Sequence, residues 1–125
     1  MMPTIDRAEA ILDEIANELP PVFFEELNGG ICLLPESRPS PEPDVGELYI
    51  LGEYHQDNMG RTIYIYYGSF ECVYGPMSER QLRKRLRETL LHEFTHHWES
   101  LGGERDLEIR DEERMWRYRE EYRDR

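Results

Sequence analysis

Apolar residues recur at the spacing of an α-helix near the start of the chain and again in its second half. The first set follows Thr4, a residue suited to the N-cap, and precedes Pro20–Pro21, which cannot continue a helix. A helix is therefore predicted between these two signals. Its apolar face consists of Ala8, Ile11, Leu12, Ile15 and Leu19.

The second set is longer and contains neither proline nor glycine. Its apolar stripe consists of Leu82, Leu86, Leu90, Phe94, Trp98 and Leu101. Ser78 and Gln81 have the spacing of a capping box in front of the stripe, and Gly102–Gly103 follow it as a stop signal. The pattern predicts one long helix over residues 78–101.

Between the two helices the pattern changes to short runs of β-branched and aromatic residues, which are typical of strands. The runs cover residues 31–34, 47–55 and 61–67, and the second and third should pair as a hairpin. The proline-rich stretch 35–46 is predicted to be a loop, and residues 68–77 to be irregular.

Residues 111–123 are highly charged around a few apolar anchors and are predicted to form a last helix. Together the elements predict an α+β fold. It has an N-terminal helix, a small three-stranded sheet, a long helix and a C-terminal helix. A length of 125 residues suits one domain over residues 1–125.

The long helix contains His-Glu-x-x-His, from His92 to His96. Four-residue spacing puts both histidines on one helix face, roughly opposite the centre of the apolar stripe. Two imidazoles so placed can hold one Zn²⁺, and Glu93 can act as general base on a metal-activated water. His97 lies nearer the apolar side and is predicted to be a packing residue, or a residue that supports the metal ligands from behind, rather than a ligand itself.

A catalytic zinc usually takes three protein ligands, so one more is needed. The chain can turn back after Gly103, and each further residue spans about 3.3 Å. Asp106 and Glu108 can therefore return to the metal, whereas Glu104 is closer to the turn. His55, in the predicted hairpin, is a further candidate. The residues alone leave this choice open.

Composition limits the classes of partner. A formal net charge of −12 argues against nucleic acid, which needs a basic surface. No apolar run of about 18 residues is present, so we expect no membrane span. Cys32 and Cys72 are too few for a disulfide scaffold and are expected to be buried free thiols in apolar, strand-like surroundings. With no secretory signal at the start, we expect a cytoplasmic protein.

The motif, followed by a glycine and an acid, resembles the zincin metallopeptidases, and most closely the small bacterial zincin-like metallopeptidases known as minimal zincins. The His-Glu-x-x-His part is specific. The likeness extends, as support only, to residues 28–35, 48–52 and 65–68. It implies a core of helices and a small sheet, a Zn²⁺ cofactor in a cleft, and a peptide or protein substrate.

Carried over residue by residue, the resemblance implies His92, His96 and Asp106 as metal ligands and Glu93 as the catalytic residue. Residues 103–106 keep the family's Gly-x-x-Asp offset, although the glycine comes about one helical turn later than in the family pattern.

The leading hypothesis is a zinc-dependent peptidase with Glu93 as general base. The alternative is a zincin-derived, metal-stabilised domain that binds a protein or peptide without turnover, because so small a domain has little wall for a deep cleft. A third hypothesis, an acidic helical adaptor, would leave His92 and His96 without metal. The oligomeric state is not predicted.

Overall fold

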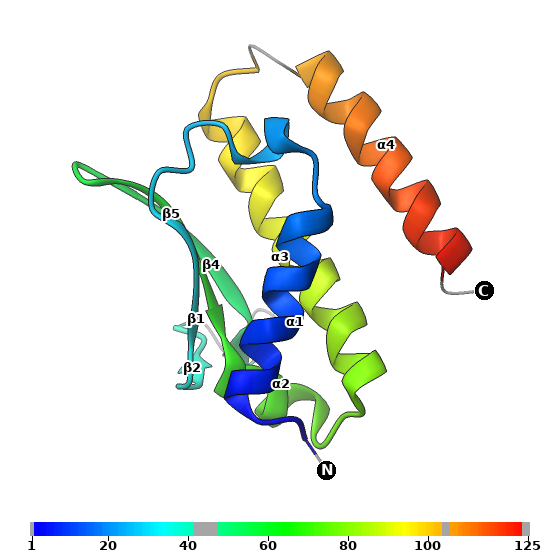
Figure 1. Cartoon of the computed structure of the whole chain (residues 1–125). Coiled ribbons are helices and arrows are strands. Elements are labelled where there is room, and N and C mark those ends of the chain that lie inside the picture. The colour runs from blue at the N-terminus through cyan, green and yellow to red at the C-terminus, as the bar shows by residue number, and fades with distance from the viewer. Residues whose placement is uncertain (1, 42–47, 104–105, 124–125) are drawn as a thin grey trace.

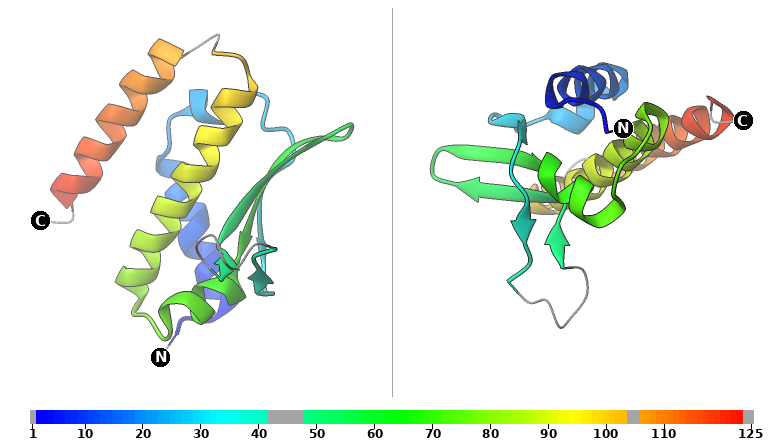
Figure 2. Two further views of the ribbon diagram at one scale, coloured as in Figure 1. Left: turned by 180° about the vertical axis from the view of Figure 1, so that it is seen from behind. Right: turned by 90° about the horizontal axis from the view of Figure 1, so that it is seen from below.

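The computed structural model describes residues 2–41, 48–103 and 106–123. Its elements in chain order are α1 (Ile5–Glu18), the 3₁₀ turn η1 (Pro21–Phe24), β1 (Gly30–Leu34), β2 (Arg38–Pro39), β3 (Tyr49–Ile50), β4 (Gly52–Asp57), β5 (Gly60–Tyr66), α2 (Tyr67–Tyr74), α3 (Glu79–Ser100) and α4 (Asp106–Arg123). Helices α1 and α3 lie on one side of the sheet, and α4 lies beyond α3, away from the sheet (Figures 1 and 2). The predicted α+β class is confirmed.

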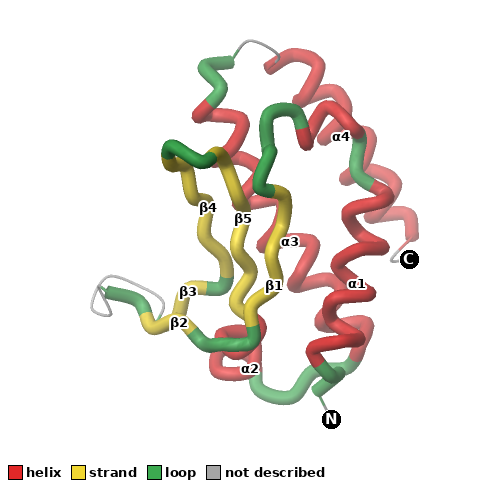
Figure 3. The backbone as a smooth tube through the Cα atoms, turned by 60° about the vertical axis from the view of Figure 1, so that its left-hand side comes forward, coloured by secondary structure: helices red, strands yellow, loops and turns green. Residues whose placement is uncertain are grey.

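The main sheet has three strands in the order β1-β5-β4. Strands β4 and β5 form the predicted antiparallel hairpin, with Asp57 opposite Gly60. Strand β1 pairs with β5 in parallel, with Gly30 opposite Thr62. Strands β2 and β3 form a separate two-stranded ribbon at one end of this sheet (Figure 3). The order leaves β4 at the edge of the sheet.

One hydrophobic core joins the sheet to the helices. Ile63 and Ile65 of β5 are fully buried, as are Ile11 of α1 and Phe94 of α3. Aromatic rings complete the core near the end of α3, where Phe94 and Trp98 stack with their ring centroids 5.8 Å apart. The apolar stripe read from the sequence is thus the face that fixes α3 against the sheet and α1.

The predicted helix signals are confirmed at both helices. Thr4 caps α1, where its side-chain oxygen accepts from the backbone N–H of Arg7. At α3 the Ser78 hydroxyl accepts from the backbone N–H of Gln81, whose side-chain oxygen accepts from the backbone N–H of Ser78 in return. These reciprocal bonds satisfy N–H groups that a helix start leaves unpaired.

Several expectations were wrong. Residues 68–77 are not irregular, because α2 occupies most of them. Burial of Tyr67 and Phe70 against the core supports this helix, although its pattern is too short to read from sequence. Helix α4 begins at Asp106 rather than Asp111, because Ile109 adds a buried anchor. Cys72 is exposed on α2 rather than buried in a strand.

Among the helices of the described ranges, none combines the length and the apolar character needed to cross a lipid bilayer.

Candidate metal centre

The histidine pair lies on the outward face of α3, as the helical spacing predicts. Both His92 and His96 are exposed, and their ring centroids are 4.9 Å apart with the rings perpendicular. His96 Nδ1 lies 3.9 Å from a carboxylate oxygen of Glu99 on the next turn. Two neighbouring imidazoles open to solvent are a donor set that fits Zn²⁺ as two of its ligands.

Glu93 lies beside this pair but is buried, with only 6% of its surface exposed. It packs against Gly52 at the start of β4, where an added Cβ would lie 3.2 Å from Glu93 Cγ and 3.0 Å from Thr89 Cγ2. A residue without a side chain therefore lets the edge strand approach α3 at this point. Burial raises the pKa of the Glu93 carboxyl, and the neighbouring His92 and His96 oppose that rise.

The free edge of β4 runs past Glu93. The Tyr66 N–H donates to the Leu51 carbonyl at 2.9 Å, which sets the alternation of the ladder. In an antiparallel pair the next residues then point their N–H and C=O groups the other way, so those of Gly52 and Tyr54 face outward. Within the described ranges no strand pairs with this side of β4. The buried carboxyl thus lies next to unpaired backbone groups that can bind an extended chain.

His97 is fully buried, which confirms it as a packing residue. Its Nε2–H donates to the Glu25 carbonyl at 2.7 Å, and its Nδ1 lies 2.9 Å from the Tyr54 hydroxyl. The same hydroxyl lies 2.9 Å from the Ser100 side-chain oxygen. Burial lowers the pKa of the His97 imidazole, so the ring is neutral at neutral pH.

Among the residues that the structure describes, no third-ligand candidate lies at the histidine pair. Asp106, at the start of α4, lines a pocket with Thr95, Trp98 and Glu99. Over the ranges that the structure describes, no group of three His, Cys, Asp or Glu side chains is close enough to hold a metal ion.

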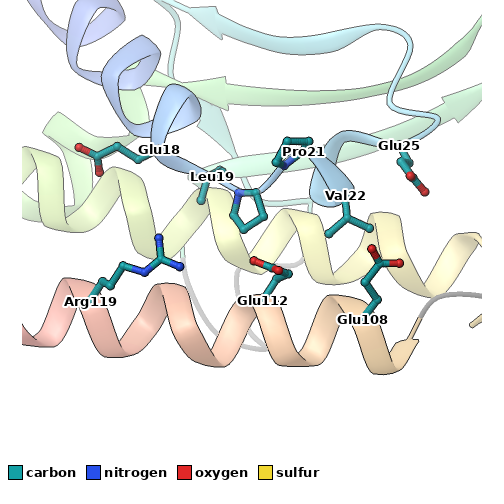
Figure 4. A pocket seen from close by; sticks show the side chains of 9 residues that line it. Glu18, Leu19, Pro21, Val22, Glu25, Glu108, Glu112 and Arg119 are labelled. Atoms are coloured by element: carbon teal, nitrogen blue, oxygen red, sulfur yellow. The ribbon is translucent and has the colours of Figure 1, made fainter.

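The other candidates lie elsewhere. Glu108 lines an acidic groove between α4 and the segment that joins α1 to η1 (Figure 4). His55 extends from β4 and contacts Glu53, with 2.7 Å between its Nε2 and the carboxylate oxygen. The odd-numbered positions of β4 alternate with Tyr54, so His55 lies on the sheet face away from α3. Glu104 falls outside the described residues.

Two residues beside the centre were not identified from sequence. Gly52 permits the close approach of β4 to Glu93, and Tyr54 links β4 to His97. Both belong to one face of a strand by period-two alternation, and a glycine inside a strand often marks a close backbone approach. That signal was readable, but its partner on α3 was not.

These features define an α+β protein that presents a His-Glu-x-x-His helix beside the free edge of a small sheet. The chain belongs to the zincin-like metallopeptidase family, whose model matches residues 46–117, more than half of its length.

The solved structure of a conserved hypothetical protein from Thermus thermophilus is similar, with a TM-score of 0.69 and 32% sequence identity. The similarity covers 80% of this chain and 98% of that one. No curated protein matches the sequence.

Proposed function

We propose that this protein is a zinc-dependent peptidase. The observation that carries the proposal is the position of Glu93, a buried carboxyl between two exposed histidines and the free edge of β4. A base, a pair of metal donors and a strand edge that can bind an extended chain are the parts that metal-assisted hydrolysis of a peptide bond needs.

His92 and His96 would hold the Zn²⁺, with Asp106 as the proposed third ligand. The support for Asp106 is the Gly-x-x-Asp offset of residues 103–106, and Glu108 and Glu104 remain the alternatives. When bound, the ion supplies the Lewis acidity that activates water at neutral pH.

Glu93 then acts on the proton. Its carboxylate takes a proton from the water that attacks the scissile carbonyl and delivers it to the leaving amine nitrogen as the C–N bond breaks. Burial favours this role because a raised pKa brings a carboxyl closer to the working pH. The outward N–H and C=O groups of Gly52 and Tyr54 would bind the substrate backbone in extended form and orient it.

The alternative is a family member that binds metal and peptide without turnover. One observation favours this alternative: among the described residues, no third ligand lies beside the two histidines. The domain is also small, and the histidine face is open rather than enclosed.

The test of the proposal is digestion of a proteome-derived peptide library. The purified protein should cut a subset of peptides, a chelator should abolish cleavage, and added zinc should restore it. Mass spectrometry of the new termini measures the result. If the zinc-loaded protein cuts nothing in the library, the proposal fails in favour of the binding domain.

The third ligand has its own prediction. Loss of a residue that only hydrogen-bonds to a metal ligand typically costs about 10–100-fold in metal affinity. Asp106→Ala should weaken zinc binding by more than this, because it would remove a ligand itself. Glu108→Ala is the matched control, since it removes a negative charge from the same first turn of α4 and so loses a similar interaction with the helix dipole. Competition titration with a zinc indicator measures both. A larger loss in Glu108→Ala would move the assignment from Asp106 to Glu108.

A further inference from the structure

The side chain of Tyr54 connects the edge strand to the motif helix. It extends from β4 and ends on His97, the residue that directly follows the second histidine of the motif, with its hydroxyl 2.9 Å from Nδ1. The two rings also pack, with centroids 5.5 Å apart. Over the described residues β4 pairs with β5 on one side only, so a contact to α3 restrains the strand across the direction of its own ladder.

His97 is a fixed point for that contact. Its other ring nitrogen donates to the Glu25 carbonyl after η1, and the ring lies 6.5 Å from that of Phe94 in the core. A fully buried imidazole with a partner at each nitrogen has one favourable orientation, because any other would leave a buried polar atom unsatisfied. His97 thus holds Tyr54 at a defined height above α3.

The height of β4 matters because it sets how closely the strand approaches Glu93. The strand carries Gly52 against Glu93, and Gly52 and Tyr54 both present backbone groups at the free edge. Tyr54 therefore contributes its backbone to the free edge of β4 and anchors the strand to α3 through its side chain.

We infer that His97 and Tyr54 form a clamp that sets the position of the free edge of β4 relative to Glu93 and the His92–His96 pair. His97 is a positioning residue and touches neither metal nor substrate. The inference deepens the proposed function and rests on it for its catalytic consequence, while the clamp itself is a property of the fold.

The two hydrogen bonds of the His97 ring can be removed one at a time by two substitutions at this position. The Nε2–H of neutral His97 donates to Glu25, so Nδ1 accepts from the Tyr54 hydroxyl. The amide of asparagine ends where Nδ1 lies, and that of glutamine reaches the position of Nε2. His97→Asn can therefore keep the bond to Tyr54, and His97→Gln the bond to Glu25.

The first measurement is amide hydrogen exchange, which requires no activity. The N–H groups of Glu53 and His55 point toward β5, so their exchange reports the opening of β4. His97→Gln should speed exchange at these two amides about fivefold to tenfold, the factor that one hydrogen bond is worth. Tyr54→Phe should speed it by at least as much, because this variant also loses the contact to Ser100. His97→Asn should stay near the parent.

The control is Tyr64→Phe. It removes a tyrosine hydroxyl from the strand beside β4, on the sheet face away from the helices, since Ile63 and Ile65 face the core. Exchange at Glu53 and His55 should not change in this variant. An unchanged rate in Tyr54→Phe and His97→Gln, or a rise spread evenly over α1 and β1, would overturn the clamp.

The second measurement is kinetic, on the best-cut library peptide. In Tyr54→Phe and His97→Gln the KM should rise about tenfold with kcat within about twofold, because a displaced strand edge weakens substrate binding without removing the base. Zinc content should be unchanged in both variants. His97→Asn, which keeps the bond to Tyr54, should have the KM of the parent protein. If the parent cuts no peptide, the proposed function fails alone and the exchange data still decide the clamp. If kcat falls and KM does not rise, the positioning role is wrong.

Discussion

Glu93→Gln should lower the rate of peptide hydrolysis by about 10²–10⁴-fold, the usual loss when a general base is removed. Glutamine has nearly the same size and keeps a hydrogen-bonding group, but it cannot take a proton from water. The residue lies beside His92 on the helix and packs against Gly52, so the fold and the zinc content should both be retained. Initial rates on a library peptide, together with metal analysis, measure the outcome.

Glu88→Gln is the matched control for this change. Glu88 is exposed on the same helix and pairs with Arg85. Glu88→Gln therefore removes the same negative charge from α3, but not at the candidate centre. Hydrolysis should be unaffected in this variant. If Glu93→Gln loses its zinc, Glu93 is a ligand and the proposed mechanism is mistaken. If it keeps both zinc and full activity, the base is another group.

The double variant His92→Ala/His96→Ala should contain almost no zinc, whereas the parent should bind about one ion per chain. Both side chains are exposed, so their truncation leaves no cavity in the core and the variant should fold normally. Metal analysis after gel filtration, with circular dichroism as a check on folding, gives the comparison.

His55→Ala is the control for the loss of a histidine. Its imidazole is half exposed and contacts Glu53 on the sheet face away from α3, so zinc content should stay at the parent level. Equal zinc in the double variant and the parent would remove the candidate centre altogether. A loss in His55→Ala would make that residue the missing ligand.

The fold places two of the proposed metal ligands side by side but not the third. Both histidines come from one rigid helix, so their spacing needs no tertiary contact beyond those that hold α3. The proposed third ligand, Asp106, lies beyond Gly102–Gly103, and both glycines have positive φ angles of 78° and 79°. Its position depends on how the chain leaves α3, and this is why the Asp106 and Glu108 variants are the decisive comparison for the ligand set.

Sequence alone determined the parts of the protein that depend on local rules. Helix α3 was predictable because its capping box, apolar stripe and terminal glycines act within a few residues of one another. The exposure of His92 and His96 and the burial of His97 followed from the same period, since 3.6 residues per turn fix each side chain relative to the stripe. The β4-β5 hairpin was likewise set by a short turn between two strand-like runs.

The tertiary structure decided what depends on distant pairing. Three features rest on contacts between segments far apart in the sequence. They are the parallel pairing of β1 with β5, the helical form of residues 67–74 and the early start of α4 at Asp106. The two contacts that shape the candidate centre, Gly52 on Glu93 and Tyr54 on His97, also join distant segments. Periodicity assigns a residue to a face of its own element. Which face of another element it meets is settled only when the core packs, because burial free energy is shared among all the segments that enter it.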